Sequence, residues 1–342
     1  MADQAKMLHD LLAAFYGRLG KVLRDAVQQQ KQAADIAALI AALKRKDINA
    51  ALRALNIDPA HFTTLSETLR AAFIEAGIAA ASALPSYVDG GVRAAFTFDV
   101  RNPRAERWIA KLSSDLIAHI TETTRDAVRV ALLDGMEAGR NPRRTALDVV
   151  GRLNVRTRQR VGGVIGLTPK HAESVMGLRR ALESGDYEAW FSRELRDRRF
   201  DRTVRRLMRD GGSLPADKID AMVTLYQSRY ELYRGEMIAR TESLSALNAA
   251  SHEAAQQAVQ RAGIDQRDVR RVWQSAGDGR VRDTHRAMHG QIVGLNEPFR
   301  SPSGATLRFP GDPGAPAEER IHCRCIAITR IDFLSNAGRA AA

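Results

Sequence analysis

Four side chains near the end of the sequence have the types and spacing of a metal site. His285 and His289 stand at positions i and i+4, which a helix would place on one face. Cys323 and Cys325, the two cysteines of the chain, stand at i and i+2, which a strand would place on one face. Two imidazoles and two thiolates form a ligand set for tetrahedral Zn²⁺. These four residues are therefore candidate zinc ligands.

The same residues allow simpler and more reactive interpretations. Cys-x-Cys is tighter than the usual structural zinc spacing, which favours cysteines packed as small hydrophobic residues beside a His285 hydrogen-bonded in the core. A catalytic alternative combines a nucleophilic cysteine with His285 and with Asp278 or Asp283. No segment has the pattern of an oxyanion hole, and extended backbone would strain a disulfide between Cys323 and Cys325. We predict no catalytic residue.

An arginine-rich segment is the second candidate site. Four arginines follow a helical 4-3-4 spacing: Arg198, Arg202, Arg205 and Arg209. Four apolar residues fall on the opposite side of this expected helix: Phe200, Val204, Leu207 and Met208. Such a basic ridge suits the phosphates of a nucleic acid or an acidic protein surface, without sequence-specific readout. The alternative is a solvated face that is partly paired with Asp197 and Asp201.

The composition suits a polyanionic binding partner and argues against membrane-spanning and disulfide-dependent proteins. The 342 residues carry a formal net charge of +12, and the stretch 140–209 has 18 Lys and Arg against 8 Asp and Glu. Charged residues interrupt every apolar stretch before it reaches the roughly 18 to 20 residues of a membrane-spanning helix. Two cysteines and no cleavable apolar leader indicate a compartment where disulfides are not needed. We expect a soluble protein.

The elements that position these residues are predicted to be mainly α-helical. Asp58-Pro59, Asn102-Pro103, Asn141-Pro142 and Thr168-Pro169 are helix starts, one long helix ends near Gly139, and Gly211-Gly212 ends the arginine-rich helix. A further helix runs from Leu214 to a C-cap at Gly263 and contains Arg240 and Glu242, which could anchor it to the terminal unit. After it come a strand at 268–275, a short helix at 281–289 and a final strand at 323–331.

This pattern predicts a mainly α protein with a long helical N-terminal and central region, followed by a small α+β C-terminal domain. The expected divisions are a helical N-terminal arm at 1–100, an Arg-rich helical core region at 101–236, an α+β domain at 237–331 and a flexible tail at 332–342.

The C-terminal motifs together resemble the domain of phage Mu F-like minor head proteins, the phage head morphogenesis family. The resemblance covers roughly 237–331 and, more loosely, two upstream stretches in 139–175. It is carried by ordered motif residues: Arg240-Thr241-Glu242, Trp273, Asp278, Arg282, Asp283, His285, Gly290, Phe299, Pro310 and Cys323-Arg324-Cys325. It implies a structural element around the cysteines and no enzyme.

The resemblance also implies a place and partners. We expect a minor capsid protein of a tailed phage or prophage, in the head interior near the portal, and in the host cytoplasm during assembly. Its expected partners are the portal protein, packaged double-stranded DNA bound non-specifically, and scaffold or major capsid protein, with no membrane before ejection. It would support head assembly and DNA packaging or ejection, as a standalone protein without the fused toxin domain or portal segment of some relatives.

Two other functions stay open at this point. One is a phage-delivered enzyme, either a hydrolase using Cys323 with His285 or a metal-dependent nuclease, although the sequence shows no convincing carboxylate cluster for a nuclease metal. The other is a free DNA-binding protein that reads charge and not sequence.

Overall fold

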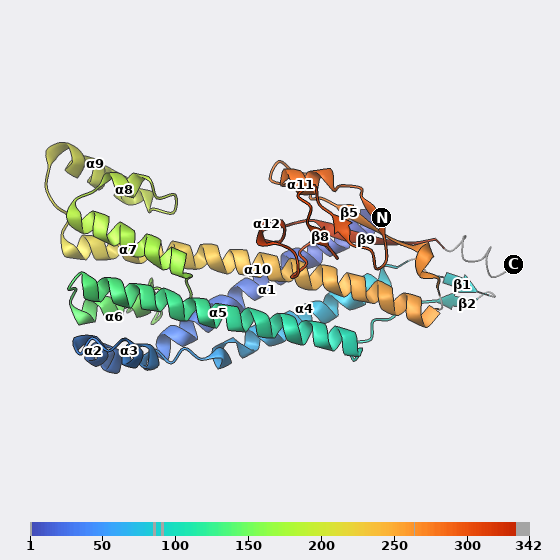
Figure 1. Ribbon diagram of the computed structural model, residues 1–342, viewed down its shortest axis with the longest axis horizontal. Coiled ribbons are helices and arrows are strands. Elements are labelled where there is room, and N and C mark those ends of the chain that lie inside the picture. Colours follow the sequence, from blue (N-terminus) through green and yellow to red (C-terminus); the bar gives the residue numbers. More distant parts are fainter. Residues whose placement is uncertain (1, 85–86, 90–91, 263, 333–342) are drawn as a thin grey trace. The chain divides into compact units, whose positions relative to one another are not determined.

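The computed structural model describes residues 2–84, 87–89, 92–262 and 264–332 (Figure 1). It confirms a mainly α protein with a small α+β region at its C-terminal end. The predicted C-cap at Gly263 and residues 333–342 of the predicted tail lie outside the described residues.

Helices make up most of the described chain. The α-helices are α1 (Ala2–Gln32), α2 (Ile36–Lys44), α3 (Ile48–Ala54), α4 (Thr63–Ser82), α5 (Pro103–Glu137), α6 (Pro142–Val150), α7 (Pro169–Ser184), α8 (Glu188–Phe191), α9 (Asp201–Asp210), α10 (Ala216–Ala262), α11 (Asp283–Ala287) and α12 (Ala317–Arg320). Short 3-10 turns are η1 (Pro59–Phe62), η2 (Arg198–Phe200) and η3 (Gln266–Asp268).

Strands are short and antiparallel. They are β1 (Tyr87–Asp89), β2 (Val92–Ala94), β3 (Arg152–Leu153), β4 (Arg160–Val161), β5 (Val269–Gln274), β6 (Ile292–Gly294), β7 (Phe299–Arg300), β8 (Thr306–Leu307) and β9 (Ile326–Ile331). The largest described sheet has the order β6-β5-β9, and Trp273 of β5 lies opposite Ala327 of β9. The other described strands pair as two-stranded ladders.

The predicted helix starts are confirmed by their caps. Asn141 Oδ1 accepts a hydrogen bond from Arg143 N at 2.9 Å, and Pro142 occupies the first helical position of α6. Thr168 Oγ1 accepts from His171 N at 3.3 Å at the start of α7. These local signals act within one turn, so they are readable without knowledge of the tertiary fold.

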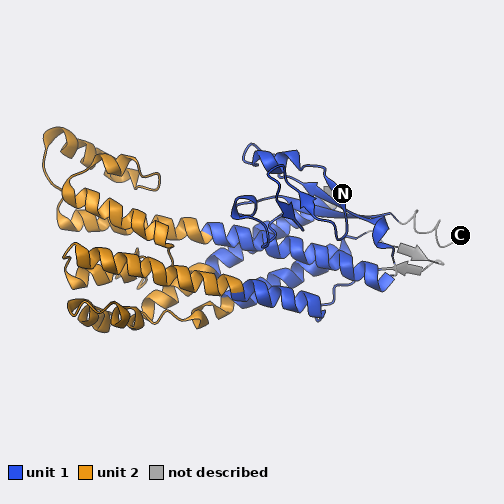
Figure 2. Ribbon diagram, viewed as in Figure 1, with its two compact units in different colours: residues 1–22, 65–114, 236–342 blue, residues 23–64, 115–235 orange. Residues whose placement is uncertain are grey.

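The chain divides by internal contact into two compact units (Figure 2). Unit 1 comprises residues 1–22, 65–114 and 236–342, and unit 2 comprises 23–64 and 115–235. Both units take residues from α1, α5 and α10. The units are discontinuous in sequence, and the four ranges predicted above stay predictions.

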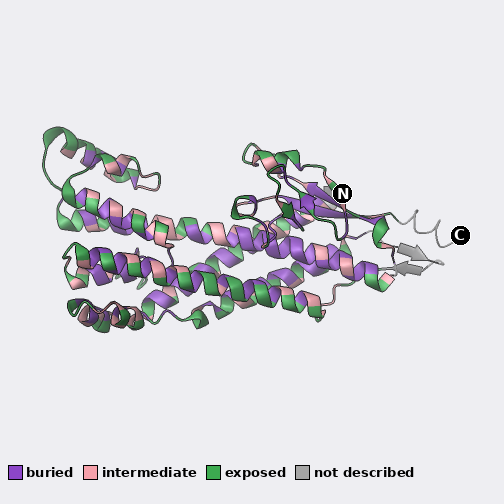
Figure 3. Ribbon diagram, viewed as in Figure 1, coloured by how far each residue is buried: buried purple, intermediate pink, exposed green. Residues whose placement is uncertain are grey.

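Unit 2 is a helical core that also buries charges. Along α5 an apolar stripe is buried at Leu116, Val128 and Leu132, while the opposite side is exposed (Figure 3). The ammonium of Lys31 is fully buried, where it donates to Gly162 O at 2.8 Å and pairs with a carboxylate oxygen of Glu231 at 2.6 Å. These ionic contacts satisfy a cation that has no access to water.

The α+β part of unit 1 differs from the prediction at its last strand. The sequence predicted a strand from Cys323 to Ile331, but β9 begins at Ile326, so both cysteines lie in the loop before it. The physical reason is the pairing, because Ile326 lies opposite Gln274, the last residue of β5, and the cysteines lie beyond the end of that strand. Asn248 of α10 anchors the strand start by accepting from Ala327 N at 3.0 Å.

Candidate metal centre

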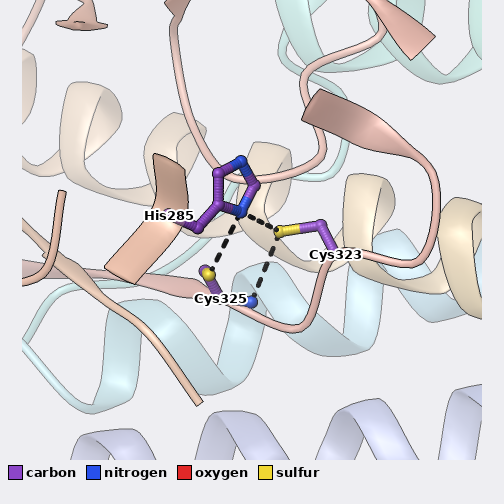
Figure 4. A group of neighbouring side chains, drawn as sticks. All are labelled: His285, Cys323 and Cys325. Atoms are coloured by element: carbon purple, nitrogen blue, oxygen red, sulfur yellow. Dashed lines mark hydrogen bonds between the residues drawn. The ribbon is translucent and has the colours of Figure 1, made fainter. Parts of the chain in front are cut away.

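Three of the four predicted zinc ligands meet in the interior of unit 1. His285 Nδ1 lies 3.4 Å from Cys323 Sγ and 3.5 Å from Cys325 Sγ (Figure 4). The three donor atoms all lie within 4.8 Å of one another. Each of these residues is at most 2% exposed, and both cysteines are free thiols. Both sulfur atoms therefore point to the same side, toward one imidazole, as predicted. They do so from a loop and not from a strand.

The imidazole is held from its other side. His285 lies on α11, and its Nε2 is 2.8 Å from Glu319 Oε2 of α12. The Glu319 carboxylate accepts hydrogen bonds from the hydroxyls of Ser301 at 2.8 Å, Ser303 at 2.6 Å and Thr284 at 3.2 Å. Burial raises the pKa of Glu319, but these hydrogen bonds and His285 outweigh it, so the pKa is lowered. The ionised Glu319 carboxylate therefore faces Nε2 as a charged neighbour, although the geometry of this contact is not that of a hydrogen bond.

Arginines fix the loop that carries the cysteines. The Arg282 guanidinium donates to the carbonyl oxygens of Glu318 and Ile321. Arg324, between the two cysteines, forms a bidentate ion pair with Asp278, with Nη2 at 2.6 Å from Oδ1. The Arg324 hydrogen bond holds the pKa of Asp278 well below its usual range. Because both side chains of this pair are partly exposed, we assign it a positioning role and no large contribution to stability.

The two thiols have unequal electrostatic surroundings. Burial raises the pKa of Cys323 well above its usual value. Hydrogen bonds from Cys323 and His285 lower the pKa of Cys325 to about 5, although its burial acts in the opposite direction. Cys325 N also donates to Cys323 Sγ at 3.4 Å. One negative charge is therefore accommodated at this pair of sulfurs more readily than two, unless a cation joins them.

His289, the fourth predicted ligand, is not part of this cluster. Its side chain is exposed, and its Nδ1 lies 3.2 Å from Ser275 N and 3.1 Å from Ser275 Oγ. The predicted i, i+4 pairing with His285 needs a continuous helix, but α11 ends at Ala287. Glu319, which contacts His285 instead, was not predicted, because a glutamate in "AEER" carries no spacing signal that would identify it.

The remaining motif residues surround the cluster or mark its edges. Trp273 and Phe299 are fully buried in the same hydrophobic core as the cysteines, and the Trp273 ring stands edge-on to His285 at 5.1 Å. Asp283 is at the surface and pairs with Arg286. On α10, the Arg240 guanidinium lies 5.4 Å from the centre of the Tyr16 ring. Glu242 is buried, and burial raises its pKa to about 7.

The arrangement leaves little room for the catalytic alternative. The sulfurs and His285 are closed off from solvent, so a substrate has no route to a nucleophile at this depth. The aspartates expected to orient the base do other things: Asp278 binds Arg324, and Asp283 faces solvent. Among the described residues, His285, Cys323 and Cys325 are the group of three or more His, Cys, Asp or Glu close enough to share an ion.

The arginine ridge lies in unit 2, apart from the cysteine cluster in sequence. All four arginines, Arg198, Arg202, Arg205 and Arg209, are exposed. The helix itself is shorter than predicted, because α9 begins at Asp201 and Arg198 lies in the preceding turn η2.

The surroundings of the ridge differ from the prediction in two respects. Val204 is buried as expected, but Met208 is 42% exposed. Only a narrow apolar stripe of α9 packs against the rest of unit 2. Asp197 pairs with Arg199 at 2.6 Å and Asp201 with Arg196 at 3.1 Å, so these carboxylates bind arginines outside the ridge. Within the ridge, Arg205 stacks over the Phe191 ring and Arg209 pairs with Asp210.

Comparison with known proteins gives two matches. Residues 175–328 match the family of phage Mu protein F like proteins. Over 101 residues the chain is 31% identical to the minor head protein GP7 of Bacillus phage SPP1, a stretch that is 30% of this chain and 31% of that protein. The chain thus spans about a third of the length of this curated relative.

Two negative findings complete the comparison. No solved structure was found to match the chain. Within the described residues, the long helices are all too polar to pass through a lipid bilayer.

The family match begins in α7 and ends within β9, and it therefore includes the arginine ridge, α10 and all three clustered ligands. The resemblance seen in the sequence is confirmed, and residues 175–328 of this chain are a phage Mu F-like region.

Proposed function

We propose that this chain is a minor head protein of a tailed phage or prophage, located inside the head near the portal. The observation that carries the proposal is the Mu F-like match over residues 175–328, together with the 31% identity to the minor head protein GP7. In this role the chain binds the portal protein, supports head assembly and takes part in DNA packaging or ejection. Scaffold or major capsid protein is a second assembly contact.

The role is structural in this proposal, and no residue is assigned to catalysis. Burial of His285, Cys323 and Cys325 supports this, since a hydrolase would present its nucleophile to substrate. The test of portal binding is co-expression of the chain with the portal protein of the same phage, followed by size-exclusion chromatography with light scattering. A stable complex in physiological salt supports the proposal, and complete separation of the two proteins contradicts it.

We further propose that the arginine ridge contacts the phosphates of packaged DNA. The exposed guanidinium groups of Arg198, Arg202 and Arg205 and the chain's net charge of +12 support non-specific binding. Replacing these three residues by Glu should weaken binding to duplex DNA by more than about tenfold, because three phosphate contacts are lost. The same change should make the negative slope of the logarithm of the association constant against the logarithm of salt concentration shallower by about 3.

A matched control separates a local contact from an effect of total charge. Arg267, Arg280 and Arg286 are exposed arginines of unit 1, and the same triple change to Glu alters net charge equally. Fluorescence anisotropy across a salt series measures both variants. Equal loss of affinity in the two triples, or no loss in the ridge triple, would contradict the assigned contact.

A further inference from the structure

We propose that His285, Cys323 and Cys325 bind one thiophilic metal ion, Zn²⁺ in the first place, through Nδ1 and the two Sγ atoms. The ion would hold the small C-terminal part of unit 1 together. This inference does not depend on the head-protein role, because it rests on the geometry of three side chains and their neighbours.

The distances between the donor atoms fit a metal ion. In a tetrahedral site with Zn–S of about 2.3 Å and Zn–N of about 2.05 Å, the nitrogen and each sulfur lie about 3.6 Å apart. His285 Nδ1 is 3.4 Å and 3.5 Å from the sulfurs of Cys323 and Cys325. The two separations are nearly equal, as they must be when a common ion sets both.

Hydrogen bonding alone leaves this cluster incompletely satisfied. His285 Nε2 faces Glu319, and Nδ1 offers either one lone pair or one N–H to the sulfurs. Figure 4 shows both sulfur atoms at this one nitrogen, which forms one good hydrogen bond in either protonation state. A cation between the three atoms would use the nitrogen lone pair and both sulfurs at the same time.

The neighbours are those that support metal ligands. A carboxylate behind a ligating histidine fixes the tautomer and increases the basicity of the free nitrogen, and Glu319 stands in that position behind His285. Glu319 is itself held by three hydroxyl donors. On the sulfur side, the backbone N–H of Cys325 donates to Cys323 Sγ, which stabilises a thiolate.

Charge gives a further reason for a divalent ion. Two buried thiolates would carry two negative charges into a site that is closed to water, and unpaired buried charge is costly. Two thiolates and one Zn²⁺ sum to zero charge. Both thiols are reduced and available as ligands.

The position of the site explains what an ion would stabilise. The ligands are 38 and 40 residues apart along the chain and join α11 to the loop before β9. The segment between them consists of two- and three-residue strands, the four-residue helix α12 and turns, and elements this short are marginally stable on their own. A metal crosslink is a common means of stabilising such a segment. The described residues supply three donors, so a fourth ligand would be a small molecule enclosed together with the ion.

The experiment uses the full-length chain, purified under reducing conditions and dialysed against Zn²⁺ and then against metal-free buffer. Metal content is measured by inductively coupled plasma mass spectrometry and by native mass spectrometry. We expect roughly one zinc per chain, and loss of at least about nine tenths of it in His285→Ala and in the double variant Cys323→Ser, Cys325→Ser. His289→Ala is the matched control and should keep its zinc, because His289 bonds to Ser275 and lies outside the cluster.

Two further measurements keep the proposal testable if a ligand variant fails to fold. Co²⁺ in place of Zn²⁺ in the wild-type chain should give the sulfur-to-cobalt charge-transfer absorption of thiolate ligation. Glu319→Gln should weaken zinc affinity by about 10- to 100-fold without removing a ligand.

The opposite outcomes are equally definite. Wild-type protein that binds neither zinc nor cobalt, with two thiols that titrate freely on unfolding, would show a hydrogen-bonded thiol cluster only. A mass lower by two hydrogens under non-reducing conditions would show a disulfide. Either result would overturn the metal site and would leave the head-protein proposal untouched.

Discussion

Replacing Glu242 by Gln should stabilise the protein at alkaline pH and leave it nearly unchanged at acid pH. Glu242 lies within α10 and is buried, and burial raises its pKa from 4.5 to about 7, although the charge of Arg320 acts to lower it. The folded state therefore keeps a proton that the unfolded chain releases near its ordinary pKa. Stability from this group is fully present below about pH 4.5 and is lost as the pH rises through 7.

The magnitude follows from the size of the shift. At about 1.4 kcal/mol per pKa unit, the difference between 4.5 and about 7 corresponds to roughly 3 kcal/mol at about pH 8.5. Gln is a neutral side chain of the same shape, and it avoids burying a charge. We expect Glu242→Gln to raise the free energy of unfolding by up to about 3 kcal/mol at about pH 8.5, and by less than about 0.5 kcal/mol near pH 4.5.

Urea unfolding followed by circular dichroism at the two pH values measures this difference. Glu67→Gln is the control, because Glu67 is exposed on α4 and its replacement should change stability by less than about 0.5 kcal/mol at both pH values. An effect of Glu242→Gln that is equal in size at both pH values, or destabilisation at alkaline pH, would refute the reasoning about burial.

Three substitutions outside the metal centre test the buried cation of Lys31 and the close backbone contacts of Gly163. Lys31→Ala should lower the free energy of unfolding by about 3 to 5 kcal/mol in a urea titration, because it leaves Glu231 without its buried partner. Gly163→Ala should be more destabilising than an ordinary surface change, since its φ is +90° and a Cβ would lie 2.7 Å from backbone atoms. Gly17→Ala, where a Cβ meets nothing within 4 Å, should instead be neutral or stabilising by up to about 1 kcal/mol; equal effects of the two glycine changes would contradict the strain argument.

Helix starts were predictable because their signals are local. Asn141-Pro142 and Thr168-Pro169 combine a capping oxygen with a ring that pre-sets φ, and both act within the first turn. The long helix α5 was likewise readable from its apolar stripe and its Asn102-Pro103 start. Such features need no information from distant parts of the chain.

Only some of the residues of the candidate site were predictable from the sequence. His285 and the two cysteines were identified by type, but the reason for their convergence is tertiary. Cys323 and Cys325 reach His285 from a loop that is held by Arg324 and Asp278, 46 residues apart, and not from the strand that the sequence indicated. Contacts over that separation leave no periodic pattern.

The errors at the edges of the site have the same origin. His289 was paired with His285 by helical spacing, but α11 is too short to hold both residues on one face. Glu319 was overlooked because its role depends on the position of α12 beside α11. At the arginine ridge, Met208 was predicted to be packed, but it is exposed. Other parts of unit 2 cover only a small part of the surface of α9.

The central claim is the proposal that this chain, whose residues 175–328 match the phage Mu F-like family, is a component of the phage head. It is tested most directly by quantitative mass spectrometry of particles purified on a density gradient, with the abundance of the chain measured relative to the portal protein in full and in emptied heads. The account predicts that the chain is present in full heads in numbers comparable with the portal protein and far below the major capsid protein. Loss from emptied heads would add ejection with the genome, whereas absence from full heads would contradict the claim.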